Sequence, residues 1–193
     1  MEIKKAEFLT TVANTSELLT LKNEFAFVGR SNIGKSTLIN ALCNNSKLAK
    51  TSSNPGKTKF VNYFKINDGD VHFIDLPGYG YHNASKQDEE KWIGLIEQYF
   101  LKAQTLKCVF VLVDIRHEVS PLDALMIDFL VYNRLPFVIV LNKIDKLSKS
   151  EVNRQQNLIS KTLGIPQGNM VLASGQNKLG LKQILEKMEQ YKD

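Results

Sequence analysis

Short apolar runs recur along the chain and are separated by longer amphipathic stretches. The runs are FAFV at 25–28, VHFI at 71–74, CVFVLV at 108–113, FVIVL at 137–141 and MVLA at 170–173. Runs of this length are typical of strands buried on both faces, as strands are in parallel sheets. FVNYFKI at 60–66 is predicted to pair with the run at 71–74 as an antiparallel hairpin, because NDGD joins the two.

The stretches between the runs have the spacing of amphipathic helices. Residues on one helical face include Trp92, Ile93, Ile96, Tyr99 and Phe100 in one stretch, and Leu181, Ile184, Leu185 and Met188 in another. SPLD at 120–123 predicts a helix start, with a Ser cap, Pro in the first turn and Asp at the positive end of the helix dipole. Alternating strands and helices predict an α/β fold, a doubly wound, mostly parallel sheet with one antiparallel edge hairpin.

Length and composition limit the class of protein. The 193 residues suit one domain, 1–193, with a short N-terminal extension at 1–23. The first residues lack the apolar core of a signal peptide and no run could span a bilayer, so we expect a cytoplasmic protein without stable membrane insertion. Cys43, Cys108 and the three histidines do not have the spacing of a zinc site.

GRSNIGKST at 29–37 follows the run at 25–28 and opens a helical pattern. It is the phosphate-binding pattern of Gly, four residues and Gly-Lys-Ser, in the context that this pattern requires. Gly29 and Gly34 allow a loop whose backbone amides point inward. Lys35 can reach the β and γ phosphates, and Ser36 can bind Mg²⁺. The sequence therefore predicts a site for a nucleoside triphosphate.

NKID at 142–145 follows the run at 137–141 and indicates which base is bound. Asn142 can hydrogen-bond the purine edge, and the stem of Lys143 can cover the base. Asp145 can accept from the ring and exocyclic N–H groups that guanine has and adenine lacks. A buried carboxylate left unpaired by the wrong base discriminates strongly, so the motif favours GTP over ATP.

Two further motifs end strands at the same edge of the predicted sheet. In DLPG at 75–78, Asp75 can hold the metal through water and Gly78 can bring its amide to the γ-phosphate. ASG at 173–175 can offer amides to the guanine carbonyl. Thr58, in the loop before the hairpin, can complete the Mg²⁺ shell when the γ-phosphate is present. Because the carboxyl ends of parallel strands meet at one edge, these motifs are predicted to form one site.

Basic residues accumulate between positions 24 and 68, where no acid intervenes, and contribute to a net charge of +5. Five of them exceed what one nucleotide needs, namely Lys47, Lys50, Lys57, Lys59 and Lys65. Three interpretations stay open: a solvated basic face, a surface for RNA phosphates, and a surface for a protein or membrane.

The motifs resemble those of the EngB family, also called YihA or YsxC, bacterial GTPases in the group that includes TrmE, Era, EngA, EngB and the septins. The matching stretches are FAFVGRSNIGKSTLINAL, TSSNPGKTKFVNYFKIND, HFIDLPGYGY, VLVDIRHEVSPLD and NKID, which together span most of the chain. The resemblance implies a Ras-like P-loop GTPase fold and a role in large-ribosomal-subunit assembly and in normal septation during cell division. The chain departs from the family pattern at Asn142, Gly175 and His82.

The predicted nucleotide-binding and cofactor-binding residues come from all of these motifs. They are Gly29, Arg30, Ser31, Asn32, Ile33, Gly34, Lys35, Ser36, Thr37, Gly56, Lys57, Thr58, Lys59, Phe60, Asp75, Leu76, Pro77, Gly78, Asn142, Lys143, Ile144, Asp145, Ala173, Ser174 and Gly175. Lys35, Thr58 and Gly78 are predicted to be catalytic. Ser36, Thr58 and Asp75 are predicted to hold Mg²⁺. Asn32 has two interpretations, a K⁺ ligand and an asparagine that tolerates a left-handed backbone in a tight loop.

The sequence predicts slow intrinsic hydrolysis. Ras-like enzymes orient the attacking water with a Gln after Asp-x-x-Gly, but this chain has Tyr79 there, and a phenol is a poor base at neutral pH. We therefore expect acceleration by a cation or a partner. For Arg116 and His117 in DIRH we favour packing or partner binding over catalysis.

The expected function is that of a monomeric GTPase switch, which binds GTP and GDP and docks on rRNA or protein of the large ribosomal subunit. The alternative is a non-enzymatic scaffold of the division or membrane machinery that GTP stabilises. Asp145 opposes an ATP-dependent kinase.

Overall fold

The computed structural model describes residues 1–50, 60–80 and 86–192, so the segments 51–59 and 81–85 and residue 193 lie outside the description. The strands are β1 (Ala6–Val12), β2 (Glu24–Gly29), β3 (Val61–Ile66), β4 (Val71–Asp75), β5 (Leu106–Asp114), β6 (Phe137–Asn142) and β7 (Met170–Leu172). The helices are α1 (Lys35–Leu42), α2 (Lys86–Lys102), α3 (Pro121–Tyr132), α4 (Lys149–Leu163) and α5 (Leu181–Lys192).

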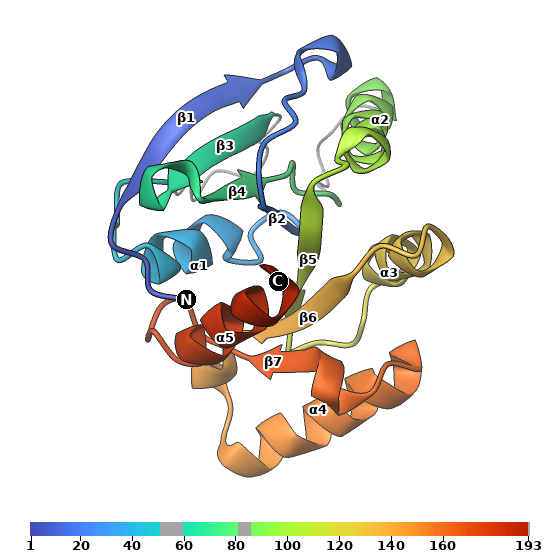
Figure 1. Ribbon diagram of the computed structural model, residues 1–193. Coiled ribbons are helices and arrows are strands. Elements are labelled where there is room, and N and C mark those ends of the chain that lie inside the picture. Colours follow the sequence, from blue (N-terminus) through green and yellow to red (C-terminus); the bar gives the residue numbers. More distant parts are fainter. Residues whose placement is uncertain (51–59, 81–85, 193) are drawn as a thin grey trace.

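All of these strands form one sheet, in the order β1-β3-β4-β2-β5-β6-β7 (Figure 1). β2 pairs in parallel with β4 and β5, and β6 and β7 continue the parallel part. β3 pairs antiparallel with β4 across the turn Asn67–Gly69. The predicted hairpin and the doubly wound, mostly parallel sheet are therefore confirmed, and the carboxyl ends of β2, β4, β5, β6 and β7 share one edge.

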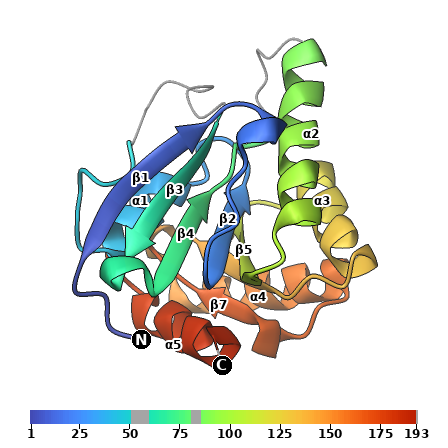
Figure 2. The same cartoon turned by 45° about the horizontal axis from the view of Figure 1, so that its top comes forward.

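Helices cover the sheet on both faces and create two hydrophobic cores. α1 and α5 contribute to one core, and α2, α3 and α4 contribute to the other; α2 and α3 are seen along the same side of the sheet in Figure 2. On α2, Ile96, Tyr99 and Phe100 are buried as predicted, but Ile93 is 42% exposed, and the side chain of Trp92 lies outside the description. Within the described ranges, no helix is both long and apolar enough to cross a bilayer.

β1 is an additional strand that the apolar pattern does not predict. It lies within the expected N-terminal extension and pairs antiparallel with β3, so β1 rather than the hairpin forms this edge of the sheet. Its register shifts between Phe8 and Thr10. Phe8 and Leu9 are adjacent and both exposed, which breaks the alternation by which a half-buried strand is recognised.

The start of α3 is organised by its cap. The Ser120 side chain accepts from the backbone N–H of Asp123, and the Asp123 carboxylate accepts from the backbone N–H of Ser120. Pro121 occupies the first helical position, where its missing N–H breaks no helical hydrogen bond. The helix start predicted from SPLD is confirmed, and it fixes Asp123 near the loops that end β2 and β4.

Candidate functional site

The phosphate-binding loop connects β2 to α1, as the sequence predicts. The loop spans 30–34, and Gly34 has a left-handed φ of 97° immediately before the helix. A Cβ at Gly29 would lie 2.8 Å from the carbonyl oxygen of Leu112, and one at Gly34 would lie 2.8 Å from Nδ2 of Asn142. Both contacts are too close for a side chain, so glycine at these two positions lets the loop pack against the ends of β5 and β6.

The DLPG segment runs beside the phosphate-binding loop. The backbone N–H of Tyr79 donates to the carbonyl of Gly29 (3.3 Å), and that of Ser31 donates to the carbonyl of Tyr79 (2.9 Å). Gly78 lies against the backbone of Ser31. The end of β4 and the loop after β2 are thus joined by backbone hydrogen bonds and cannot move independently without breaking them.

Lys35 and Asp75 form a buried ion pair between these two segments. Nζ of Lys35 contacts Oδ1 of Asp75, and both residues are almost completely covered. A buried charge needs a partner because transfer out of water is costly, so each residue satisfies the other in this arrangement. The two side chains predicted to meet the phosphates and the metal are therefore adjacent at the start of α1.

Asn142 joins the loops that follow three different strands. Its Nδ2 donates to the carbonyl of Ile33 (2.9 Å), and its Oδ1 accepts from the backbone N–H of Gly175 (3.4 Å). The residue is 3% exposed. The amide therefore links the phosphate-binding loop to the ASG loop. The predicted contact of Asn142 with the purine edge stays a prediction.

Lys143 lies across the phosphate-binding loop. Its Nζ donates to the carbonyl of Asn32 (3.2 Å), and its Cε is 4.0 Å from the position that a Cβ on Gly34 would occupy. The backbone of Lys143 has a left-handed φ of 70°, which turns the chain away from β6. The stem is thus placed over the loop, beside the expected position of a base.

Asp145 and the ASG loop form the remaining wall. The backbone N–H of Ile144 donates to the carbonyl of Ala173 (3.2 Å). A hydrogen bond from the Ser174 hydroxyl lowers the pKa of Asp145, and Lys146, whose Nζ lies 3.1 Å from the carboxylate, lowers it further. Asp145 is therefore an ionised acceptor at neutral pH, as recognition of two N–H donors on a base requires.

The structure brings the predicted residues of four motifs to one edge of the sheet. Ser36 and Thr37 lie in the first turn of α1, Leu76 and Pro77 are buried beside the phosphate-binding loop, and Phe60 is exposed just before β3. Gly56, Lys57, Thr58, Lys59 and His82 lie outside the described residues.

Asp114, the first residue of DIRH, belongs to this edge, although the sequence predicts no role for it. It ends β5, and its carboxylate accepts two hydrogen bonds from Arg116, at 2.9 Å from Nε and 2.7 Å from Nη2. Nζ of Lys143 lies 3.0 Å away on the other side. Burial alone would raise the pKa of Asp114, but the hydrogen bonds from Arg116 and Lys143 hold it at about 2. A charged residue directly after the apolar run 108–113 was the available signal.

The side chain of Tyr79 is hydrogen-bonded to Asp123 in the first turn of α3. Its hydroxyl donates to Oδ1 of Asp123 (2.8 Å), and its ring belongs to the core. Burial raises the pKa of the hydroxyl well above its usual value, and the charge of Asp123 raises it further. The phenol therefore stays protonated, which excludes it as a general base near neutral pH.

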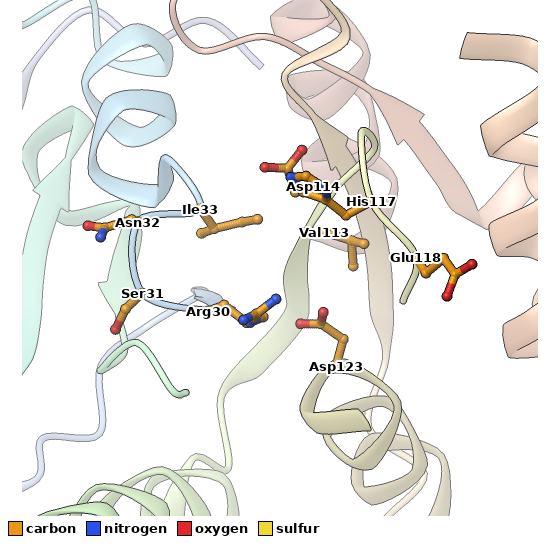
Figure 3. A pocket seen from close by; sticks show the side chains of 9 residues that line it. All are labelled: Arg30, Ser31, Asn32, Ile33, Val113, Asp114, His117, Glu118 and Asp123. Carbon is orange, nitrogen blue, oxygen red and sulfur yellow. The ribbon is translucent and has the colours of Figure 1, made fainter. Parts of the chain in front are cut away.

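A polar cavity of about 140 Å³ separates the phosphate-binding loop from the segment between β5 and α3 (Figure 3). Arg30 extends into it from one side and Asp123 from the other. Nε of Arg30 is buried and has no hydrogen-bond partner among the described residues. A cavity of this size with charged walls is suited to ordered water.

The chain is similar in sequence to one family across its length. A family model described as 50S ribosome-binding GTPase matches residues 24–143. A relative from Lachnospira eligens, named "Probable GTP-binding protein EngB", is 44% identical over 99% of this chain and 91% of its own. A relative of the same name from Clostridium kluyveri is 42% identical over 98% of this chain and 96% of its own.

Solved structures support the fold. The crystal structure of a probable GTP-binding protein engB has a TM-score of 0.72 at 22% identity, with 87% of this chain and 97% of that chain covered. The Era protein of Aquifex aeolicus has a TM-score of 0.72 at 24% identity, with 89% of this chain and 57% of that chain covered.

The fold and the arrangement of the four motifs define a P-loop GTPase. The match to the family model and the similarity to the two relatives identify the family within this class. The chain belongs to the EngB family of GTP-binding proteins. The family and the fold expected from the sequence are both confirmed.

We predict that Tyr79→Phe destabilises the protein without changing the chemistry. The buried Asp123 carboxylate would lose a hydrogen-bond donor, so the free energy of unfolding should fall by about 1–3 kcal/mol, while single-turnover GTP hydrolysis should be unchanged. Tyr132→Phe is the matched control, because Tyr132 is 87% exposed, and should alter neither quantity. A large fall in hydrolysis at unchanged stability would show that the Tyr79 phenol takes part in the reaction.

Proposed function

We propose that the chain is a GTP-hydrolysing switch that uses Mg²⁺ and acts, as a cytoplasmic monomer, in assembly of the large ribosomal subunit and in normal septation. The observation that carries the nucleotide part is the Asn142 amide, which links the phosphate-binding loop to the ASG loop. In the proposed complex these loops, with Lys143 and Asp145 beside them, hold the phosphates and the guanine base.

The phosphate end of the site has the charges that a magnesium-bound nucleotide requires. Lys35 is a buried cation at the N-terminus of a helix, and Asp75 is a buried carboxylate beside it. In the proposed complex Lys35 binds the β and γ phosphates, while Asp75 faces the metal and Ser36 binds it. Mg²⁺ supplies neutralisation of charge on the phosphates. The proposed roles of Gly78 and Thr58 complete this end of the site.

In the proposed complex, nucleotide binding has to break the direct ion pair between Lys35 and Asp75, which costs free energy. A phosphate group attracts Lys35 away from Asp75, and the released carboxylate then needs a cation. Asp75 and Ser36 would hold Mg²⁺ there, so phosphate and metal would support each other's binding.

The base end accounts for guanine specificity. The lowered pKa of Asp145 keeps its carboxylate charged for the N–H donors of guanine, and the stem of Lys143 supplies an apolar surface over the ring. Adenine lacks these N–H donors, so it would cover the Asp145 carboxylate without filling the acceptor positions that Ser174 and Lys146 leave open, which is costly.

Hydrolysis is proposed to be slow in the isolated protein. Lys35 stabilises charge on the phosphates, and the amide of Gly78 can orient the γ-phosphate. Tyr79 donates to Asp123 and does not orient a water molecule. A cation or a docked partner therefore has to supply what the isolated protein lacks, which is further charge stabilisation or a group that orients the attacking water.

We predict that Asp145→Asn lowers affinity for GTP and raises affinity for xanthosine triphosphate. Xanthine has a carbonyl where guanine has its 2-amino group, and an amide can donate to that carbonyl. Competition between the two nucleotides for the purified variant measures the change, with Asp128→Asn on the outer face of α3 as control. The base-binding role of NKID would be refuted by a nucleotide preference equal to that of wild type.

Ribosome docking is supported by the family description and by basic residues near the site. Lys47 and Lys50 are exposed in a loop that the buried Asn40 side chain holds through the carbonyls of Ser46 and Ala49 (3.1 and 2.9 Å). Lys57 and Lys59 lie outside the described residues. A lysine-rich loop of this kind can contact RNA phosphates. A scaffold that GTP stabilises without hydrolysis is the alternative.

We predict that reversing Lys47, Lys50, Lys57 and Lys59 to Glu weakens co-sedimentation with large ribosomal subunits in GTP. Each lost phosphate contact removes a released counterion, so the log-log salt slope should fall by up to about 0.9 per contact. The same four-residue reversal at Lys149, Lys161, Lys182 and Lys187 is the matched control. An unchanged slope would identify the first surface as a solvated face, and equal sedimentation of wild type in GTP and GDP would favour the scaffold.

Asn32 is proposed to bind K⁺ against the phosphates. The residue is exposed in the phosphate-binding loop with a left-handed φ of 63°, which also suits an asparagine that only shapes the loop. We predict that KCl stimulates GTP turnover relative to NaCl and CsCl at equal ionic strength, and that Asn32→Ala abolishes the difference. Equal rates of wild type in the three salts would leave Asn32 with the loop-forming role alone.

A further inference from the structure

Asp114 lies between two cations at the edge of the candidate site. Asp114 is paired with Asn142 in the β5–β6 register. Lys143 follows Asn142 directly, so the side chains of Asp114 and Lys143 are close enough to meet at the ends of the two strands. Oδ2 of Asp114 is 2.7 Å from Nη2 of Arg116 and 3.0 Å from Nζ of Lys143. Its side chain is 14% exposed, so water screens these contacts less than those of an ordinary surface pair.

Arg116 fixes the direction of the Asp114 carboxylate. The guanidinium donates to both oxygens, at 2.9 Å and 2.7 Å, and the backbone N–H of Arg116 adds a third hydrogen bond at 3.1 Å. A planar fork that binds both oxygens of a carboxylate restrains its rotation, which a single point contact does not do. The contacts with Arg116 thus orient the carboxylate independently of Lys143.

Lys143 transmits this orientation to the phosphate-binding loop. The same Nζ that contacts Asp114 donates to the carbonyl of Asn32 at 3.2 Å. A lysine side chain is flexible and loses rotamer entropy when it is held, so a second anchor beyond the carbonyl reduces the number of positions that it occupies. Arg116, Asp114, Lys143 and Asn32 therefore form one continuous chain of contacts.

The charge state of Asp114 suits an anchor. Burial by itself raises the pKa of a carboxyl group, because it disfavours the charged form. The hydrogen bonds from Arg116 and Lys143 instead hold the pKa of Asp114 at about 2, despite burial, so it is ionised wherever the protein functions near neutral pH.

We propose that Asp114 and Arg116 are positioning residues for guanine-nucleotide binding, which hold Lys143 against the phosphate-binding loop without touching the nucleotide. The proposal rests on the proposed function, since Lys143 is placed at the base there. It gives the DIRH motif a role in the nucleotide site in place of the packing or partner binding expected from the sequence.

We expect Asp114→Asn to lower the affinity of the protein for GDP and GTP. Loss of a charge-assisted hydrogen bond predicts a dissociation constant about tenfold higher, mainly through faster dissociation, because affinity differences between closely related complexes lie mostly in the dissociation rate. Arg116→Gln should give a smaller change in the same direction, because Asp114 keeps its charge but loses its fixed orientation.

A double-mutant cycle separates positioning from a general effect on the fold. Affinities for a fluorescent GDP analogue and its dissociation rates are measured for wild type, Asp114→Asn, Lys143→Met and the double variant, with the unfolding free energy of each measured without nucleotide. If Asp114 acts through Lys143, Asp114→Asn should have no further effect in the Lys143→Met background. Arg116→Gln, at an exposed position, is run through the same cycle, so that the test stands if Asp114→Asn does not fold.

Glu118→Gln is the matched control. Glu118 is an exposed acid of the same segment and makes no hydrogen bond or ion pair within the described part of the chain. The affinity of the Glu118→Gln variant for the GDP analogue should therefore equal that of wild type. The proposal is overturned if Asp114→Asn and Arg116→Gln bind GDP as wild type does, or if their effects persist undiminished in Lys143→Met. Wild type that binds no guanine nucleotide would instead refute the proposed function.

Discussion

The side-chain amide of Asn142 is the contact on which the geometry of the site depends. It lies at the end of β6, between a carbonyl of the phosphate-binding loop and an N–H of the ASG loop, and it is almost fully buried. Both partners are backbone groups that would be costly to leave without a hydrogen bond away from water. One amide therefore links the phosphate-binding loop to the ASG loop. The absence of a side chain at Gly34 makes room for this amide.

That contact is effective because the strands behind it are held on both faces. β2 lies between β4 and β5, and the two cores cover alternate side chains of these strands, so none of the strand ends at this edge can shift without disturbing close-packed side chains. The sheet fixes the position at which each loop begins. Hydrogen bonds between loops, such as that from the backbone N–H of Tyr79 to the carbonyl of Gly29, then set the positions of the loops relative to one another. Rigid strand ends and short links between loops together produce a preformed site.

The sequence predicts the strand ends well because burial on both faces leaves a plain apolar signature, and because the loop motifs must follow those strands. It does not predict which side chains meet. The sequence predicts a purine contact for Asn142, which stays a prediction, but not the hydrogen bonds by which Asn142 joins two loops. It does not predict that Lys35 and Asp75 contact each other, and it predicts no role for Asp114 in DIRH. Each of these contacts joins segments far apart along the chain, where spacing carries no information. β1 was not predicted for a different reason, since its exposed apolar residues give no alternation.

The end of β5 and the first turn of α3 both act on the phosphate-binding loop. Asp114, at the end of β5, contacts the lysine that crosses the loop, and Asp123, in the first turn of α3, accepts from Tyr79, whose backbone is bonded to the loop. The second contact holds the hydroxyl of Tyr79, the residue at the position where Ras-like enzymes have a water-orienting Gln, against Asp123. If the chain hydrolyses GTP as proposed, this arrangement separates binding from chemistry. The nucleotide can be held by a site that is already formed, while the attacking water is oriented only when a group from elsewhere arrives. Under these conditions the lifetime of the GTP-bound state is set by the arrival of that group, which is what a switch that reports docking requires.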